Sequence, residues 1–194
     1  FLSDAQYARG QTVVLAALEY FLDPKDSKKY NSGVITDGNI IVFSAGNDWS
    51  PTPAYPGAYY KFVCVSSVGQ DNLPSWFTNY GRGVNIAAPG GDSKLGITIL
   101  STLPSEAKSA AGQDYGYIEG TSQATPQVSS TVALGLSYAK KLGKKFTRDE
   151  FISMLLTSVD DLDNRLTGTK SAGDRTMNLD NYKGKMGTGC LDVW

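Results

Sequence analysis

Hydrophobic and polar positions along the chain follow helical spacing in some segments and strand-like runs in others. Residues 12–22 and 122–142 carry apolar side chains at intervals of three and four, which predicts two helices. The first helix presents a face of Val13, Ala16, Ala17, Tyr20 and Phe21. The second presents Ala124, Val128, Val132, Leu136 and Ala139, and it ends at Gly143.

Four shorter segments are typical of strands. Residues 39–44 and 62–68 are continuous apolar runs, the pattern of strands buried on both faces of a parallel sheet. Residues 84–87 and 97–101 are shorter, and proline or glycine closes each of them. Because these strands alternate with helices, the sequence predicts an α/β fold with a mostly parallel sheet flanked by helices.

The last third of the chain combines a helix with a long polar stretch. Thr147 and Glu150 form the pattern of a capping box that opens a helix over 148–157. Residues 160–185 are rich in Gly, Asn, Asp and Lys, so we expect a long surface excursion there. A closing segment over 187–194 follows. The sequence contains neither an internal repeat nor a low-complexity tract.

Composition narrows the possible partners. The 194 residues are 41% hydrophobic and 19% charged, the profile of a folded globular domain. Eighteen basic and nineteen acidic residues leave a net charge of -1, which argues against binding to nucleic acid. The apolar runs fall well short of the roughly 18 residues that a membrane-spanning helix needs.

Histidine and cysteine usage restricts the chemistry. The chain has no histidine, so it offers no imidazole as a general base or metal ligand. Its two cysteines, Cys64 and Cys190, could form a single disulfide. An isolated cysteine in an apolar strand, however, is usually a buried thiol. The chain starts at Phe1 without a methionine or a signal-like segment, and we expect it to be a piece or processed product of a longer protein.

One chemical motif lies where a tight turn feeds the long helix. In Gly120-Thr121-Ser122-Gln123-Ala124-Thr125-Pro126 the glycine permits the turn and places Ser122 at a helix N-terminus. Unpaired N–H groups and the positive end of the helix dipole favour a developing oxyanion there, so Ser122 is a candidate nucleophile. The alternative is that Thr121 or Ser122 simply caps the helix.

A second motif, Ser44-Ala45-Gly46-Asn47, ends the run over 39–44. Ligands usually bind at the carboxyl ends of the strands of an open parallel sheet. The Asn47 amide is suited there to donate to the oxygen of a tetrahedral intermediate, and Gly46 permits close approach of a substrate backbone. The alternative is an ordinary turn asparagine.

Six segments in order make the chain similar to a known family. They are Ala45-Gly46-Asn47, Tyr55-Pro56-Gly57, Ser75-Trp76-Phe77-Thr78-Asn79-Tyr80-Gly81, Ile86-Ala87-Ala88-Pro89-Gly90, Leu100-Ser101-Thr102-Leu103-Pro104 and Gly120 to Pro126. Together they resemble the C-terminal half of a subtilisin-like serine protease (subtilase) domain. The resemblance runs from about Val13 to the chain end and implies a subtilisin-like three-layer fold, with residues 1–194 as the C-terminal portion of a single peptidase domain.

The resemblance implies roles for five residues. Ser122 is the nucleophile, and Asn47 supplies the oxyanion-hole side chain beside the Ser122 N–H. Ser44, Ala45 and Gly46 line one wall of the pocket for the residue before the scissile bond. The family's aspartate and histidine precede the serine and are absent here, and none of Asp4, Asp23, Asp26 and Asp37 matches the aspartate motif.

The resemblance implies a serine endopeptidase acting on polypeptides, in an extracellular or cell-surface location. We expect this chain alone to be inactive and to need the missing N-terminal part of the domain, or else to dimerise or swap elements across an open sheet edge. The alternative is a degenerate subtilase, a pseudoprotease that serves as a binding or structural module. Because subtilases often bind calcium, the resemblance makes Asp160, Asp161 and Asp163 candidate ligands, although acidic residues in a loop are usually only solvated; no other metal or cofactor is implied.

Overall fold

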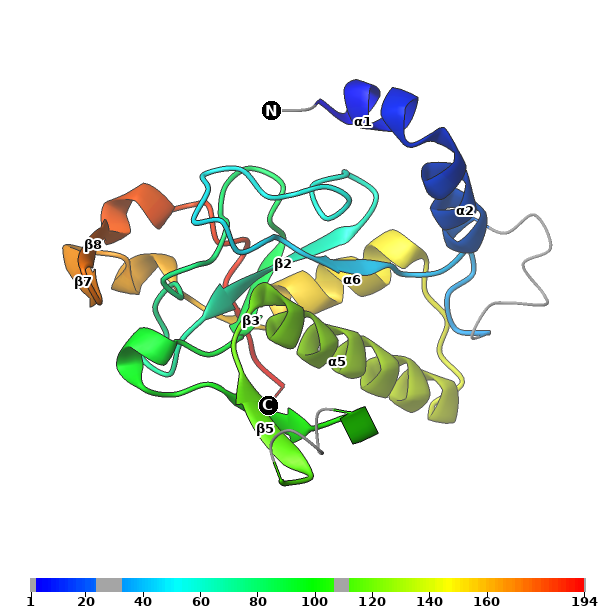
Figure 1. Ribbon diagram of the computed structural model, residues 1–194. Coiled ribbons are helices and arrows are strands. Elements are labelled where there is room, and N and C mark those ends of the chain that lie inside the picture. The colour runs from blue at the N-terminus through cyan, green and yellow to red at the C-terminus, as the bar shows by residue number, and fades with distance from the viewer. Residues whose placement is uncertain (1–2, 24–32, 107–111, 194) are drawn as a thin grey trace.

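The computed structural model describes residues 3–23, 33–106 and 112–193. Its centre is a five-stranded sheet in the order β1-β2-β3-β9-β6, as Figure 1 shows in part. The strands are β1 (Val42–Ser44), β2 (Val63–Val68), β3 (Ile86–Pro89), β9 (Cys190–Leu191) and β6 (Val159–Asp160). The first four run parallel, and β6 pairs antiparallel with β9. The predicted α/β fold with a mostly parallel sheet is confirmed.

Strand β2 is buried along its whole length, as the apolar run predicts. Alternate residues face opposite sides: Val63 and Val65 belong to one core cluster, whereas Cys64 packs in another. Strand β1 differs from the expectation, because its three residues are only half buried. It lies at the edge of the described sheet and pairs with β2 alone.

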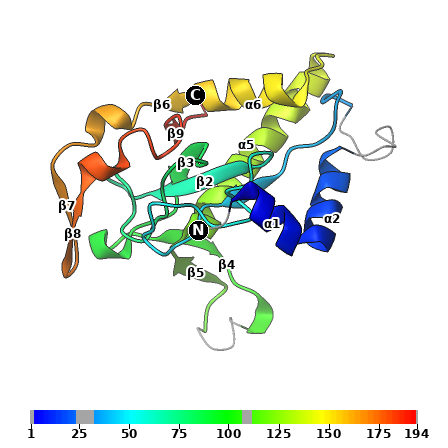
Figure 2. The same cartoon turned by 90° about the horizontal axis from the view of Figure 1, so that it is seen from above.

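Helices α5 (Thr121–Lys141) and α6 (Arg148–Thr157) cover one face of the sheet, as Figures 1 and 2 show. The predicted α5 face is confirmed, since Ala124, Val128 and Val132 pack against Val65 and Ile86. Gly143 follows the helix with φ +65°, and the Lys144 N–H bonds to the Ala139 carbonyl, closing its last turn. The capping box of Thr147 and Glu150 is present at the start of α6.

The N-terminal helices α1 (Asp4–Gly10) and α2 (Thr12–Leu22) pack near β1. The bounds predicted for α2 are confirmed, but the predicted buried face is wrong. Leu15 and Leu22 are buried against Ile41 and Phe62. Val13, Tyr20 and Phe21 are exposed instead. Nearly every position of this helix is apolar, so periodicity alone does not choose the face that packs inward.

The prediction of a surface excursion over 160–185 is also wrong. This segment contains η2 (Asp163–Arg165), η3 (Leu179–Tyr182) and an antiparallel hairpin of β7 (Thr169–Ala172) and β8 (Arg175–Asn178). Its apolar side chains are widely spaced, yet they build a core cluster. The members buried below 4% exposure are Leu162, Leu166, Ala172, Met177, Leu179 and Tyr182. They pack on Val68 and Ala87, on the sheet face opposite α5.

A second antiparallel hairpin stands apart from the main sheet. It consists of β4 (Ile99–Thr102), near the predicted strand, and β5 (Tyr115–Ile118), which the sequence pattern did not indicate. A short 3-10 helix, η1 (Ser93–Leu95), leads from β3 into β4. Figure 1 shows that β5 runs directly into α5. This hairpin therefore positions the start of the helix that carries Ser122.

Cys64 and Cys190 are both buried and free. Burial raises the pKa of the Cys64 thiol to about 12 and that of Cys190 to about 11. Within the described part of the chain, every helix is too short or too polar to cross a membrane.

Candidate active site

Asn47 and the start of α5 are joined directly. Asn47 follows β1 in an exposed turn. Thr121, the first residue of α5, is fully buried and donates its backbone N–H (2.9 Å) and its hydroxyl (2.8 Å) to Asn47 Oδ1. Because the amide oxygen is engaged in this way, the Nδ2 group of Asn47 remains as the outward donor. The asparagine is therefore more than a turn residue, since its partners lie on another element.

Two donors converge beside Gly120. A Cβ atom built on Gly120 would lie 3.4 Å from Asn47 Nδ2 and 3.6 Å from the Ser122 backbone nitrogen. The Gln123 amide oxygen lies nearer still, 2.7 Å from that Cβ position, so the two nitrogen atoms and this oxygen border the same small space. Two N–H donors that border one point are the arrangement that stabilises a developing oxyanion, once the Gln123 side chain moves aside.

Ser122 is the second residue of α5 and is exposed. Among the described residues, neither its hydroxyl nor its backbone N–H has a hydrogen-bond partner. Gly120 occupies the N-cap position and makes no side-chain cap, so neither Thr121 nor Ser122 serves as the N-cap. The free N–H belongs to the positive end of a 21-residue helix, where negative charge is favoured.

Ser44 ends β1, and Ala45 and Gly46 connect it to Asn47. The main chain of this segment is held by several hydrogen bonds. The Ala45 N–H donates to Val65 O at 2.9 Å, and the Gly46 N–H donates to the Thr121 hydroxyl at 3.2 Å. Gly46 has φ +99°, a conformation that favours glycine.

Asn79 fixes the loop that carries Asn47, and the sequence patterns gave it no such role. It is 1% exposed, and its Oδ1 accepts from the N–H groups of Asp48 (2.8 Å) and Ser50 (3.0 Å). Its Nδ2 donates to Ala45 O at 3.0 Å. A Cβ on Gly46 would lie 2.4 Å from this nitrogen, so the close approach requires glycine. The only signal in the sequence was that Asn79 belongs to the family-like segment 75–81.

A further set of contacts supports the turn before Ser122. The Gly120 N–H donates to Gly90 O at 2.9 Å, which joins this turn to the end of β3. Glu119 accepts from the Ser93 N–H (2.5 Å), the Ser93 hydroxyl (2.7 Å) and Trp76 Nε1 (3.2 Å). Glu119 therefore ties the end of β5 to η1, a role that its position in the sequence did not reveal.

A cavity of about 460 Å³ adjoins the serine, between β4 and α5. Ser122 lines it with seven other residues: Ile99, Leu100, Ser101, Gln123, Pro126, Gln127 and Ser130. Ser44, Ala45 and Gly46 are not among its lining residues. The structure thus brings Ser122 to an open groove and leaves the predicted wall segment outside that particular cavity.

The acidic residues considered in the sequence are engaged elsewhere. Asp4 accepts from the Tyr55 hydroxyl at 2.7 Å, and Asp23 pairs with Arg148 at 2.8 Å. Asp37 accepts from the Arg148 N–H, and Asp26 lies outside the described residues.

The weakly expected calcium ligands also have protein partners. Asp160 pairs with Arg165, and Asp163 accepts from the Gly184 N–H. Asp161 accepts from the Asp163 N–H and from the Asn164 amide. In the part of the chain that the structure describes, no group of three His, Cys, Asp or Glu side chains is placed to hold a metal ion.

The chain is similar in sequence to known serine proteases. The major intracellular serine protease of Bacillus subtilis (strain 168) is 30% identical over 69% of this chain and 40% of its own length. The extracellular basic protease of Dichelobacter nodosus is 32% identical over 66% of this chain and 21% of its own length. This chain therefore spans two fifths or less of these relatives.

Solved structures show the same fold. A structure described as proteases from Pseudoalteromonas arctica matches with a TM-score of 0.58 and 27% identity, over 80% of this chain and 41% of that chain. The prenylagaramide maturation protease PagA matches with a TM-score of 0.58 and 24% identity, over 79% and 48%. The family model described as Subtilase family matches residues 16–179, more than half of the chain. The chain thus belongs to the subtilase family of serine proteases.

Proposed function

We propose that this chain is the C-terminal portion of one subtilisin-like catalytic domain and carries the serine half of an endopeptidase active site. The observation that supports this most directly is the convergence of Asn47 Nδ2 and the Ser122 N–H beside an exposed serine hydroxyl. The match to subtilases over less than half of the solved chains is consistent with a partial domain.

In this proposal Ser122 Oγ attacks the carbonyl carbon of the scissile peptide bond. The negative charge that develops on the carbonyl oxygen is held by Asn47 Nδ2 and the Ser122 N–H. Because Thr121 already fixes Asn47, these donors need little reorganisation during the reaction. Ser44, Ala45 and Gly46 form one wall for the residue before the scissile bond.

The serine also needs a base to accept its proton. A serine hydroxyl is a weak nucleophile at neutral pH, and this chain contains no histidine. We propose that the base, and the acid that orients it, come from the rest of the protein. The chain by itself is then inactive. We also propose an extracellular location, although the similar proteins include one named extracellular and one named intracellular.

Labelling with a fluorophosphonate probe tests this function. The 194-residue chain and the full-length gene product are each compared with Ser122→Ala and with Ser130→Ala, which removes another exposed serine hydroxyl from the same helix and cavity. We expect the full-length protein and its Ser130→Ala variant to label, and the Ser122→Ala variant and the separate chain to remain unlabelled.

Because this chain supplies no histidine of its own, it is also compatible with a second candidate, a degenerate subtilase that binds polypeptides without cleaving them. The two candidates differ in one result. If the full-length protein is folded, is free of any propeptide and still does not label at Ser122, the endopeptidase proposal is wrong and the pseudoprotease is supported.

A further inference from the structure

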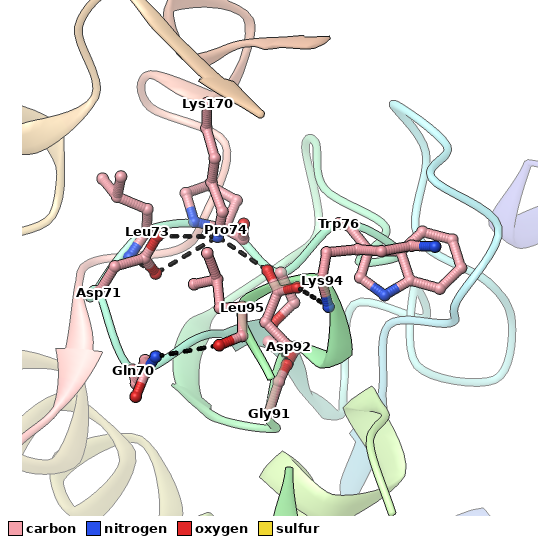
Figure 3. A network of polar contacts seen from close by, with 12 residues as sticks. Gln70, Asp71, Leu73, Pro74, Trp76, Gly91, Asp92, Lys94, Leu95 and Lys170 are labelled. Carbon is pink, nitrogen blue, oxygen red and sulfur yellow. Dashed lines mark hydrogen bonds and ion pairs between the residues drawn. The ribbon is translucent and has the colours of Figure 1, made fainter. Parts of the chain in front are cut away.

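A lysine is buried at the junction of three segments, away from the catalytic residues. Lys170 in β7 is 6% exposed, and its Nζ lies 2.8 Å from Asp92 Oδ2 and 3.0 Å from Asp71 Oδ2. The same Nζ donates to the Pro74 carbonyl at 2.9 Å. Figure 3 shows the lysine reaching from the hairpin into these oxygens. The loop after β2, the turn after β3 and the β7–β8 hairpin thus meet at one ammonium group.

The oxygens around Lys170 are of the types that a hard metal ion prefers, and water would have to complete its coordination. Two carboxylates and a backbone carbonyl converge on one buried point, and oxygen ligands of these types are preferred by Ca²⁺. Asp92 is fully buried, and the ammonium is the only partner of its Oδ2 among the described residues. Without a cation here, the Asp92 carboxylate would be buried and uncompensated, which is strongly unfavourable.

We propose that the Lys170 ammonium is a built-in structural cation, which occupies a position that a metal ion would fill if the side chain were removed. It binds the β7–β8 hairpin to two loops of the central sheet. The same carboxylate also acts locally, because Asp92 Oδ1 accepts from the Lys94 N–H and so caps η1. The hairpin also approaches η1 closely, since a Cβ added to Gly173 would lie 3.2 Å from the Lys94 side chain.

This cation fixes the scaffold behind the candidate site. Asp92 lies between Gly91, whose carbonyl accepts from the Ser75 hydroxyl at 2.8 Å, and Ser93, which is bound by Glu119. Glu119 immediately precedes Gly120 and the α5 turn. The cation therefore stabilises η1 and the end of β5 without touching any group in the active site.

Lys170→Ala tests the proposal, because it removes the ammonium and leaves the oxygens. Measured on the full-length gene product in chelator, the unfolding midpoint of this variant should fall by about 6–15 °C. Millimolar Ca²⁺ should restore at least about half of that loss, beyond any Ca²⁺ response of the wild type. The matched control Lys170→Ala/Asp92→Asn removes the buried carboxylate and should lose the added response to Ca²⁺.

Terbium luminescence gives a second readout that does not depend on activity. Trp76 lies in the same network and is suited to sensitise a Tb³⁺ ion placed there. We expect a saturable Tb³⁺ signal in Lys170→Ala that is absent from the wild type and from the double variant. Equal stability of Lys170→Ala and wild type, or equal Ca²⁺ and Tb³⁺ responses in all three proteins, would overturn the proposal.

If Lys170→Ala does not fold in chelator, refolding the denatured variant with and without Ca²⁺ tests the same proposal. Folded protein that is recovered with Ca²⁺ and not with chelator supports the proposal, whereas no folded protein in either condition contradicts it. Lys170→Arg keeps a cation in place and should therefore refold in chelator as well as in Ca²⁺.

Discussion

Thr121 holds Asn47 by two hydrogen bonds across a separation of 74 residues, one from its N–H and one from its hydroxyl. The threonine is buried under the first turn of α5, whereas the asparagine is exposed. This pair links the end of β1 to the helix that carries Ser122. It determines where the free amide donor of Asn47 points.

Thr121→Val keeps the shape of the side chain and removes the hydroxyl, which donates to Asn47 and accepts from the Gly46 N–H. Asn47 then keeps only the N–H bond, and its amide is less well fixed. If the full-length gene product is an endopeptidase, kcat should fall by about tenfold with little change in KM, since one hydrogen bond to the donor group is lost. Steady-state peptide hydrolysis measures this. Thr131→Val removes a hydroxyl from the same helix that bonds only to Gln127 O, and it should leave kcat unchanged.

Gly90→Ala should disrupt the junction of β3 with the α5 turn. The added Cβ would lie 2.1 Å from Ser67 Oγ and 2.5 Å from Gly120 O, so one of these groups must move. We expect a loss of about 1–3 kcal/mol in the free energy of unfolding, measured by urea titration. Gly10→Ala is the control, because its Cβ would have no neighbour within 4 Å. Equal stability of the two variants would contradict the packing described at Gly90.

Met177→Ala tests whether the segment over 160–185 is part of the core. Met177 is 1% exposed within the cluster that covers the second sheet face. Its truncation should lower the free energy of unfolding by about 2–5 kcal/mol. Met154→Ala, at a side chain that is 42% exposed, should cost much less. Thermal or urea unfolding of the two variants side by side measures the difference.

The thiols should be unreactive in the folded protein. With a pKa of about 11, Cys190 is about one part in a thousand thiolate at pH 8, and Cys64, with a pKa of about 12, is less ionised still. Alkylation by iodoacetamide at pH 8 should therefore be slow until urea unfolds the chain. Because folding raises both pKa values, the contribution of these two thiols to stability is fully present below about pH 8.5 and is lost as the pH rises toward 11 and 12. Rapid alkylation of the folded protein would contradict the burial of these thiols.

The exposed face of α2 should make the separate 194-residue chain self-associate. Val13 and Phe21 are 83% and 50% exposed, and β1 forms an edge of the described sheet nearby. The double substitution Val13→Asp and Phe21→Asp should weaken association by at least about tenfold, since burial of each side chain is worth roughly 1.5–3 kcal/mol. Leu134→Asp, at an exposed position of α5, should have no such effect. Sedimentation velocity distinguishes these cases, and a monomeric wild type would refute the expectation.

Local sequence patterns were sufficient to predict elements whose buried side chains recur at a regular spacing. The α5 face, the Thr147 capping box and the buried β2 run could all be predicted, because each depends on residues a few positions apart. The face of α2 could not, since an almost wholly apolar helix has no unique periodic side. Leu15 and Leu22 are buried in a cluster that includes residues distant in sequence, such as Ile41 and Phe62, and only the tertiary structure brings these together.

The sequence by itself determined the α/β class and placed Ser122 and Asn47 at element ends. The tertiary structure decided how these residues are held, through Thr121, Asn79 and Glu119. Each of these bonds joins segments that the chain keeps far apart, so neither periodicity nor a short motif contains them. The burial of Lys170 between two aspartates likewise depends on contacts between distant segments. A polar segment with widely spaced apolar side chains becomes part of the core only when the sheet provides the opposing surface.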